Sequence, residues 1–224
     1  AGGRLEVDWL LCAYSQGIFP WFEAGQPILW WSPDPRLVLT PKTIKISKSL
    51  GKLVKKHSYE VSFDTSFSEV IQQCAESRRR GDGTWITEDM QAAYIALHEA
   101  GYAHSVEIWA GGDLVGGLYG IALGKVFFGE SMFSKEDNTS KLALVYLTRQ
   151  LELWGFELID CQVTSEHLLT LGAVEIPRAE FIKKVSYLVG EEANSGSAMD
   201  KGSDQGLITN WSQLIDRVMI SHEH

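Results

Sequence analysis

The stretch Leu158-Ile159-Asp160-Cys161-Gln162 follows a long amphipathic segment and is typical of a buried strand that ends in a polar pair. Alternation along a strand puts Leu158, Asp160 and Gln162 on one face and Ile159 and Cys161 on the other. A carboxylate and a carboxamide two residues apart on one face can bind a common ligand. They can equally satisfy each other at the end of a sheet. The stretch by itself leaves both alternatives open.

The segments around this strand predict an α+β fold. Further strands are expected at 36–39, 59–64, 103–109, 114–122 and 125–131. Helices are expected at 47–57, 67–77, 88–100, 138–154 and 178–188, with N-caps at Ser47, Thr87 and Asn138. An antiparallel meander, a long helix, a strand with a polar end and a final helix occur in this order in acyltransferases of the acetyltransferase superfold. In those proteins the ligand lies near the point where central strands splay.

The composition is that of a globular chain. The 224 residues are 45% hydrophobic and 22% charged, and no run approaches the roughly 18 apolar residues that can span a bilayer. Cys12, Cys74 and Cys161 are odd in number and widely spaced in apolar contexts. They are expected to be buried thiols in a reducing compartment, without a zinc-type spacing, which favours a cytoplasmic protein.

The net charge of −9 argues weakly against a nucleic-acid partner, but positive charge is concentrated in one segment. Residues 36–80 contain ten Lys and Arg against four acids, a balance of +6 that leaves −15 for the rest of the chain. A helix capped by Ser47 would place four lysines along one side. Such a stripe is usually a solvated face, but on an acidic protein it also suggests contact with a phosphate backbone. The candidate residues for contact with such a backbone are Lys48, Lys52, Lys55, Lys56 and Arg78.

The N-terminal stretch 17–35 is unusually rich in aromatic residues and prolines. Its nineteen residues include three Trp, two Phe and four Pro, a composition that excludes regular structure. Most of these rings are expected to form a small aromatic core of an N-terminal subdomain. Stacking on a base or sugar is an alternative for one or two of them.

Two features near the opening strand bear on a ligand pocket. Leu144, Leu147 and Leu151 stand at i, i+3 and i+7 of the long helix, an apolar stripe that can face the sheet and line a pocket. Glu130 lies within the aromatic strand and needs a partner, because an unpaired buried carboxylate is costly. A salt bridge to an Arg and a bond to a substrate amine or hydroxyl remain equal alternatives.

Nine short motifs occur at residues 14–22 (YSQGIFPWF), 30–36 (WWSPDPR), 83–86 (GTWI), 104–107 (HSVE), 114–120 (LVGGLYG), 129–134 (GESMFS), 158–162 (LIDCQ), 171–173 (LGA) and 176–178 (IPR). In order and spacing they resemble those of bacterial leucyl/phenylalanyl-tRNA–protein transferases, and the resemblance covers residues 1–188. It implies an enzyme of the N-end rule that moves Leu or Phe, and less readily Met, from aminoacyl-tRNA. The acceptor would be the α-amino group of proteins that begin with Lys or Arg, which are thereby marked for degradation.

The resemblance also implies an architecture without a cofactor. A small N-terminal domain at 1–35 would pack on an acetyltransferase-like catalytic domain at 36–190, with no acyl-CoA, no metal and no membrane association. The stretch that precedes Gly2-Gly3 in the family is absent, and Ser165 stands where a common family pattern has Asn. Residues 191–224 are expected to be a linker and a tail. Apolar spacing from Leu207 to Val218 predicts a helix there, which docks on this chain's own core or on a partner.

Residue roles follow from the resemblance. Asp160 and Gln162 are the implied catalytic residues, and the hypothesis is that Asp160 polarises or orients Gln162, whose carboxamide oxygen draws on the attacking amine. A purely positional role is the alternative. The 3′ adenosine of the tRNA would lie against Trp21 and Trp85, with Tyr14 nearby and Glu130 in the same site. The implied pocket for the Leu or Phe side chain consists of Leu118, Phe127, Leu144, Leu147, Leu151 and Ile159.

Two other functions compete with this interpretation. One is an aminoacyl-tRNA-dependent transferase with another acceptor, such as a peptidoglycan precursor. The other is a non-catalytic tRNA- or peptide-binding module in which Asp160 and Gln162 are structural. Transfer from charged tRNA to an Arg-initiated peptide separates these alternatives.

Overall fold

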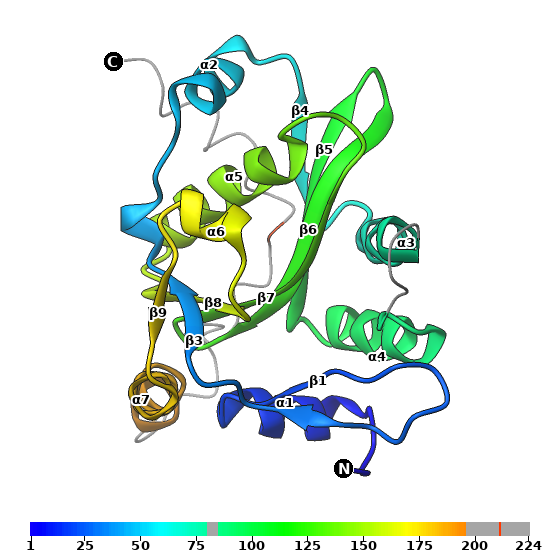
Figure 1. Cartoon of the computed structure of the whole chain (residues 1–224), viewed down its shortest axis with the longest axis vertical. Helices are drawn as coiled ribbons and strands as arrows, with labels where there is room; N and C mark the ends of the chain where they lie inside the picture. The colour runs from blue at the N-terminus through cyan, green and yellow to red at the C-terminus, as the bar shows by residue number, and fades with distance from the viewer. Residues whose placement is uncertain (80–84, 196–210, 212–224) are drawn as a thin grey trace, which may run out of the picture.

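A seven-stranded mixed sheet forms the frame of the molecule in the computed structural model, which describes residues 1–79, 85–195 and 211 (Figure 1). Across the sheet the strands are β4 (Glu60–Phe63), β5 (Ala103–Ala110), β6 (Asp113–Leu123), β7 (Val126–Ser134), β8 (Leu158–Gln162), β3 (Arg36–Leu39) and β9 (Val174–Ile176). Neighbouring strands are antiparallel except β7 and β8, which are parallel. The predicted mixed helix and strand content is therefore confirmed, whereas β9 was not predicted because residues 172–173 indicate only a turn.

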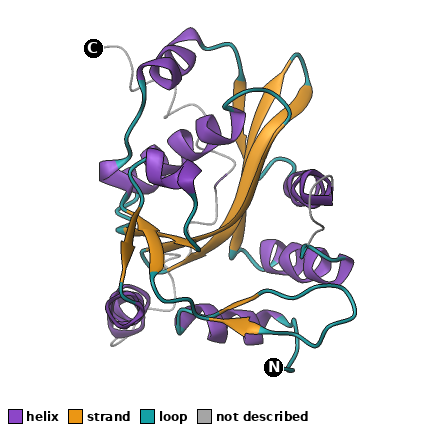
Figure 2. Cartoon of the chain, in the orientation of Figure 1, coloured by secondary structure: helices purple, strands orange, loops and turns teal. Residues whose placement is uncertain are grey.

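Helices cover both faces of the sheet (Figure 2). One face carries the helices α2 (Lys48–Lys56), α5 (Thr139–Leu153) and α6 (Glu166–Thr170), with a 3-10 turn at Pro41–Thr43. The other carries α1 (Val7–Ser15), α3 (Phe67–Arg79), α4 (Glu88–Glu99) and α7 (Arg178–Ser195). Strand alternation divides the core accordingly, since Phe128 packs in the cluster with α1 and α4 while its neighbour Phe127 packs in the cluster with α5.

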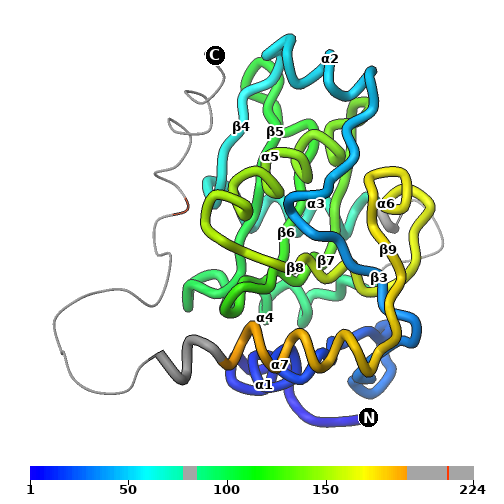
Figure 3. The backbone as a smooth tube through the Cα atoms, turned by 90° about the vertical axis from the view of Figure 1, so that its left-hand side faces the viewer, coloured from blue at the N-terminus to red at the C-terminus, as the bar shows by residue number. Residues whose placement is uncertain are grey.

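The N-terminal segment contains a small two-stranded sheet. Its strands β1 (Phe19–Pro20) and β2 (Trp30–Trp31) are antiparallel, so the expectation that this stretch excludes regular structure is wrong at these four residues. Pro20 is compatible with a strand here because the ladder has only two strands and both are edges. Helices α1 and α7 lie together at this end of the molecule (Figure 3), although they are far apart in the sequence.

Two of the three predicted helix N-caps are confirmed. The Ser47 hydroxyl accepts from the Leu50 amide and the Thr87 hydroxyl from the Met90 amide, as expected of N-caps. Asn138 was predicted wrongly, because it adopts the left-handed conformation with φ of 65° and its side chain makes no capping bond. The Ser134 hydroxyl, at the end of β7, accepts from the Ser140 amide at 2.9 Å instead.

Cys12 is exposed, contrary to the expectation that all three cysteines are buried, since it falls on the outer side of α1. Cys74 is buried and Cys161 partly so, and none of the three forms a disulfide. Within the described ranges, every helix is too short or too polar to cross a membrane.

Candidate active site

The parallel strands β7 and β8 separate part-way along their length. They pair at only three positions, and the last pair is Phe128 with Asp160. Beyond it β7 continues to Ser134 while β8 ends at Gln162, and a cavity of about 570 Å³ opens there. This is the place where the order of elements predicts a ligand site.

Glu130 reaches this opening through a β-bulge. In the β6–β7 ladder Tyr119 faces Ser131 and Gly120 faces Gly129, so Glu130 is an extra residue without a partner on β6. The ladder closes tightly beside the bulge, because a Cβ on Gly120 would lie 2.3 Å from the Phe128 carbonyl oxygen. The bulge thus directs a carboxylate, only 6% exposed, toward the end of β8.

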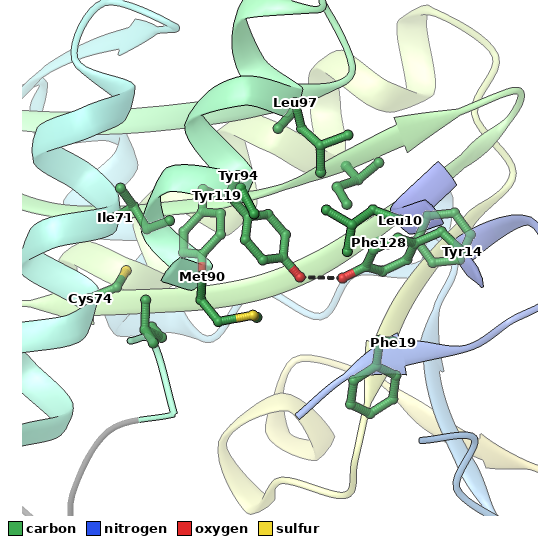
Figure 4. Close-up of a cluster of buried hydrophobic side chains, with 14 of the residues drawn as sticks. Leu10, Tyr14, Phe19, Ile71, Cys74, Met90, Tyr94, Leu97, Tyr119 and Phe128 are labelled. Atoms are coloured by element: carbon green, nitrogen blue, oxygen red, sulfur yellow. Dashed lines mark hydrogen bonds between the residues drawn. The ribbon is translucent and has the colours of Figure 1, made fainter. Parts of the chain in front are cut away.

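Two tyrosines and Gln162 bind Glu130. The Tyr14 hydroxyl on α1 donates to Oε1 at 2.7 Å, and the Tyr94 hydroxyl on α4 donates to Oε2 at 2.9 Å. The two hydroxyls also lie within hydrogen-bonding reach of each other, and Figure 4 shows them meeting across the core. Each phenol has one proton, so a bond between them replaces one bond to Glu130 or draws on the proton of a protonated Glu130. Gln162 Nε2 donates to Oε1 at 2.7 Å. Among the described residues, the partners of Glu130 are thus hydroxyls and a carboxamide and not the Arg that one of the two alternatives required.

Burial governs the ionisation of the cluster. It raises the pKa of Glu130 to about 7, with the Tyr14 and Tyr94 hydrogen bonds lowering it and the nearby Asp160 charge raising it. Burial and the charge of Glu130 likewise raise the pKa values of Tyr14 and Tyr94 well above that of an ordinary phenol, so both remain donors at neutral pH. Glu130 is therefore poised to exchange a proton near pH 7.

Asp160 is held by a buried ion pair. Arg36 Nε and Nη2 donate to its two oxygens at 2.7 and 2.6 Å, and both side chains are fully buried. The guanidinium lies between the rings of Phe19, at 4.8 Å, and Phe181, at 4.4 Å. Sequence reasoning missed Arg36, although an Arg that opens the apolar strand Leu37–Leu39 is a signal for a buried acid.

The ion pair determines how Asp160 meets Gln162. Both Asp160 oxygens bind Arg36, and Oδ1 additionally accepts from the Gln162 backbone amide at 2.9 Å. That bond stabilises Gln162 in the left-handed conformation, with φ of 64°. Asp160 thus orients Gln162 through its backbone amide. Polarisation of Gln162 would instead require Asp160 to contact the carboxamide. Among the described residues none donates to the carboxamide oxygen, and the bond from Nε2 to Glu130 assigns its orientation.

The apolar end of the cavity lies on the α5 side of the sheet. Five of the six residues implied for the side-chain pocket line it: Leu118, Phe127, Leu144, Leu147 and Ile159. Leu151 is fully buried one turn further along α5 and is not among the lining residues. Trp21, which is 39% exposed, and the half-buried Trp85 line the cavity from the N-terminal side. Tyr14 lies behind this wall and reaches the site through Glu130.

Further lining residues come from α6 and the loop before it. Ser165, which stands where a common family pattern has Asn, lines the cavity together with His167. Sequence reasoning missed His167, because a short polar turn carries no chemical signature. The lysines at 48, 52, 55 and 56 are exposed on α2 and do not line the cavity. The Arg78 side chain lies outside the described part of the structure.

Arg36→Met should destabilise the fold by about 3–5 kcal/mol, because it leaves the Asp160 carboxylate buried without its cation. Adding Asp160→Asn should recover part of this loss, since the uncompensated charge is then gone. Urea unfolding of both single variants and the double variant measures the coupling. Additive losses would show that the pair is not the reason for the destabilisation.

The raised pKa of Glu130 predicts a pH-dependent stability. Because the folded-state value of about 7 exceeds the ordinary 4.5, this group stabilises the fold fully below pH 4.5 and progressively less as pH rises through 7. Relative to Glu130→Gln, which cannot ionise, the wild type should lose at most about 3 kcal/mol of unfolding free energy between pH 5 and 8. Denaturant titrations across this range measure the difference. The exposed Glu152→Gln is the control and should retain the wild-type pH dependence.

The comparisons with known proteins agree along the chain. A model of the leucyl/phenylalanyl-tRNA protein transferase N-terminal domain matches residues 3–34, and the model of leucyl/phenylalanyl-tRNA protein transferase matches residues 38–186. The leucyl/phenylalanyl-tRNA–protein transferase of Nitrosospira multiformis is 60% identical over 84% of this chain and 81% of its own length. That of Pseudomonas fluorescens is 59% identical over 81% and 80%.

Among solved structures, L-PGS from Bacillus licheniformis matches 70% of this chain and 65% of its own with a TM-score of 0.43 and 11% identity, which is too distant to support an argument. The family models together match most of the chain, and the two relatives are far more than 30% identical to it. The chain belongs to the leucyl/phenylalanyl-tRNA–protein transferase family.

Proposed function

We propose that this aminoacyltransferase attaches Leu or Phe, and less readily Met, to the α-amino group of proteins that begin with Lys or Arg. The observation that carries the proposal is a single cavity with a polar cluster on one face of the sheet and an apolar end on the other. Such a cavity suits a donor with a nucleoside at one end and an apolar side chain at the other. The proposal includes a cytoplasmic location and the marking of acceptors for degradation.

The domain organisation and the finer fold are part of the same proposal. We take residues 1–35 as a small N-terminal domain and 36–190 as a catalytic domain of the acetyltransferase type. The parallel strands β7 and β8, joined through α5 and splaying over the cavity, support this assignment. The proposed reaction needs no cofactor, because the aminoacyl ester of the tRNA is already activated.

The donor binds along the cavity. The terminal adenosine stacks on Trp21 and Trp85, and such stacking is worth about 1–3 kcal/mol per base. The Leu or Phe side chain enters the apolar end lined by Leu118, Phe127 and Ile159 with two leucines of α5. Such a pocket discriminates by size and shape, at about 1–3 kcal/mol for each methylene, and β-branched Ile and Val fit it poorly.

The reaction forms an amide bond as the ester bond to the 3′ oxygen breaks, and the tRNA leaves as its free hydroxyl. The acceptor amine, with an ordinary pKa near 8, must attack as the neutral form and then lose a proton. We assign the carboxamide oxygen of Gln162 to accept an N–H of this amine, while Glu130 holds the carboxamide in place. Asp160 positions the Gln162 backbone.

Incubation of the full chain with Leu-tRNA and an Arg-initiated peptide tests the function. Transfer to this peptide is expected, and transfer only to a peptidoglycan precursor would replace the proposed acceptor. Binding without transfer to either acceptor would identify a non-catalytic module. Gln162→Ala should lower kcat by about 10–10²-fold, as expected for one lost hydrogen bond to an amine that gains positive charge as it attacks, without abolishing tRNA binding. Thr164→Ala, an exposed neighbour on the same loop, should keep wild-type turnover.

We also propose that the exposed lysines of α2 contact the tRNA backbone. Replacing Lys48, Lys52, Lys55 and Lys56 by Gln should weaken tRNA binding and flatten its salt dependence, by roughly 0.7–0.9 in log–log slope for each lost phosphate contact. Binding titrations between low and moderate salt give the slope. Lys183→Gln with Lys184→Gln on α7, at the opposite end of the molecule from α2 (Figure 1), is the matched control. An unchanged slope in the α2 variant contradicts this assignment.

A further inference from the structure

Beyond α7 the structure describes one residue, Trp211. Its side chain is inserted among aromatic side chains of the core. It is only 3% exposed and lies outside both ranges matched by the family models. Its neighbours, which we call the aromatic box, are Phe63, His104, Phe127 and Trp154. At this one residue the tail packs on the chain's own core, whereas the rest of the helix predicted from Leu207 to Val218 lies outside the described residues.

The box holds the indole in one orientation. The ring stacks on His104 with centroids 3.9 Å apart and planes 7° from parallel, and it meets Trp154 at 4.8 Å and 65°. His104 is itself fixed, because its Nδ1 bonds Asp64 Oδ2 at 2.8 Å. Phe63 completes the wall from β4, with ring centroids 6.2 Å from Trp211. Trp211 is therefore seated on strands of the sheet and not on a loop.

Phe127 belongs to both the box and the cavity. Its ring lies 6.1 Å from Trp211, centroid to centroid, and it also lines the apolar end of the cavity. Its backbone is fixed by pairing with Ala122 on β6 and Ile159 on β8. The side-chain torsion is consequently the degree of freedom that Trp211 restrains.

We propose that Trp211 is a specificity-determining positioning residue: by filling the aromatic box it holds the Phe127 ring as a wall of the side-chain pocket and limits the size of the aminoacyl group accepted. This inference rests on the proposed function, in which that pocket receives the donor side chain. Trp211 does not touch the donor and acts through Phe127.

Removing the indole of Trp211 should enlarge the side-chain pocket. An emptied box offers the Phe127 ring space on the side away from the cavity, and the ring can turn into it because well-packed neighbours no longer oppose the rotation. The pocket then deepens. Larger aminoacyl groups gain relative to Leu, and since one methylene is worth roughly 10–200-fold in kcat/KM, a displaced ring changes donor preference measurably.

The experiment uses the full chain and one tRNA body charged with Leu, Phe or Trp, with an Arg-initiated peptide as acceptor. In Trp211→Ala the ratio of kcat/KM for the Trp-charged to the Leu-charged donor is expected to rise at least about tenfold, and Phe is expected to gain less. Trp211→Phe, which keeps the box mostly filled and the fold intact, should raise the same ratio by a smaller factor. Leu97→Ala, a buried truncation in the opposite core cluster, controls for destabilisation and should leave the ratio unchanged.

A double-variant cycle separates positioning from general support of the fold. In a Phe127→Leu background, Trp211→Phe should no longer alter the donor ratio, because the side chain that transmits the effect is absent. An unchanged ratio in both Trp211 variants, with transfer of Leu retained, overturns the inference while the proposed function stands. A ratio that still shifts in the Phe127→Leu background also overturns it. If the wild type transfers none of the three residues, the proposed function itself fails.

Discussion

The fully buried ion pair between Arg36 and Asp160 connects the parts of the molecule that surround the cavity. It joins β3 to β8, and the guanidinium is stacked between Phe19 of the N-terminal segment and Phe181 of α7. Burying two charges is costly unless they are well paired, and the bidentate geometry supplies that pairing. The same carboxylate holds the Gln162 amide, so the conformation of the residue that faces the cavity depends on this interaction.

The two buried carboxylates of the site have different environments and so different uses. Asp160 faces a guanidinium and a backbone amide, contacts that keep a carboxylate in place. Glu130 faces two phenols and a carboxamide without a cation among the described residues, and burial brings its pKa to about 7. A group that exchanges protons near neutral pH next to the carboxamide is suited to help a reaction in which an amine loses a proton.

The separation of β7 and β8 gives the cavity access to both faces of the sheet. The Glu130 cluster belongs to the face covered by α1 and α4, whereas Phe127, Leu144 and Ile159 belong to the face covered by α5. In the proposed function, a nucleoside and an apolar side chain joined by an ester would therefore meet opposite environments within one cavity. Trp211 packs against Phe127, which lines the apolar part of the cavity, and so adds a residue from outside the matched family ranges to the surroundings of that part.

Local patterns in the sequence were sufficient for the caps at Ser47 and Thr87, the buried stripe on α5 and the strand that ends in Asp160 and Gln162, because each depends on residues a few positions apart. They were insufficient for the cap at Asn138, where Ser134 binds the Ser140 amide instead, and for β9, which pairs with the distant strand β3. The motifs identified the family and named Glu130, Asp160 and Gln162. Only the tertiary structure decided that Asp160 pairs with Arg36, 124 residues away, and that Glu130 joins Tyr14, Tyr94 and Gln162. Such pairings are set by packing between elements remote in sequence, and no local periodicity records which side chains will share a buried space.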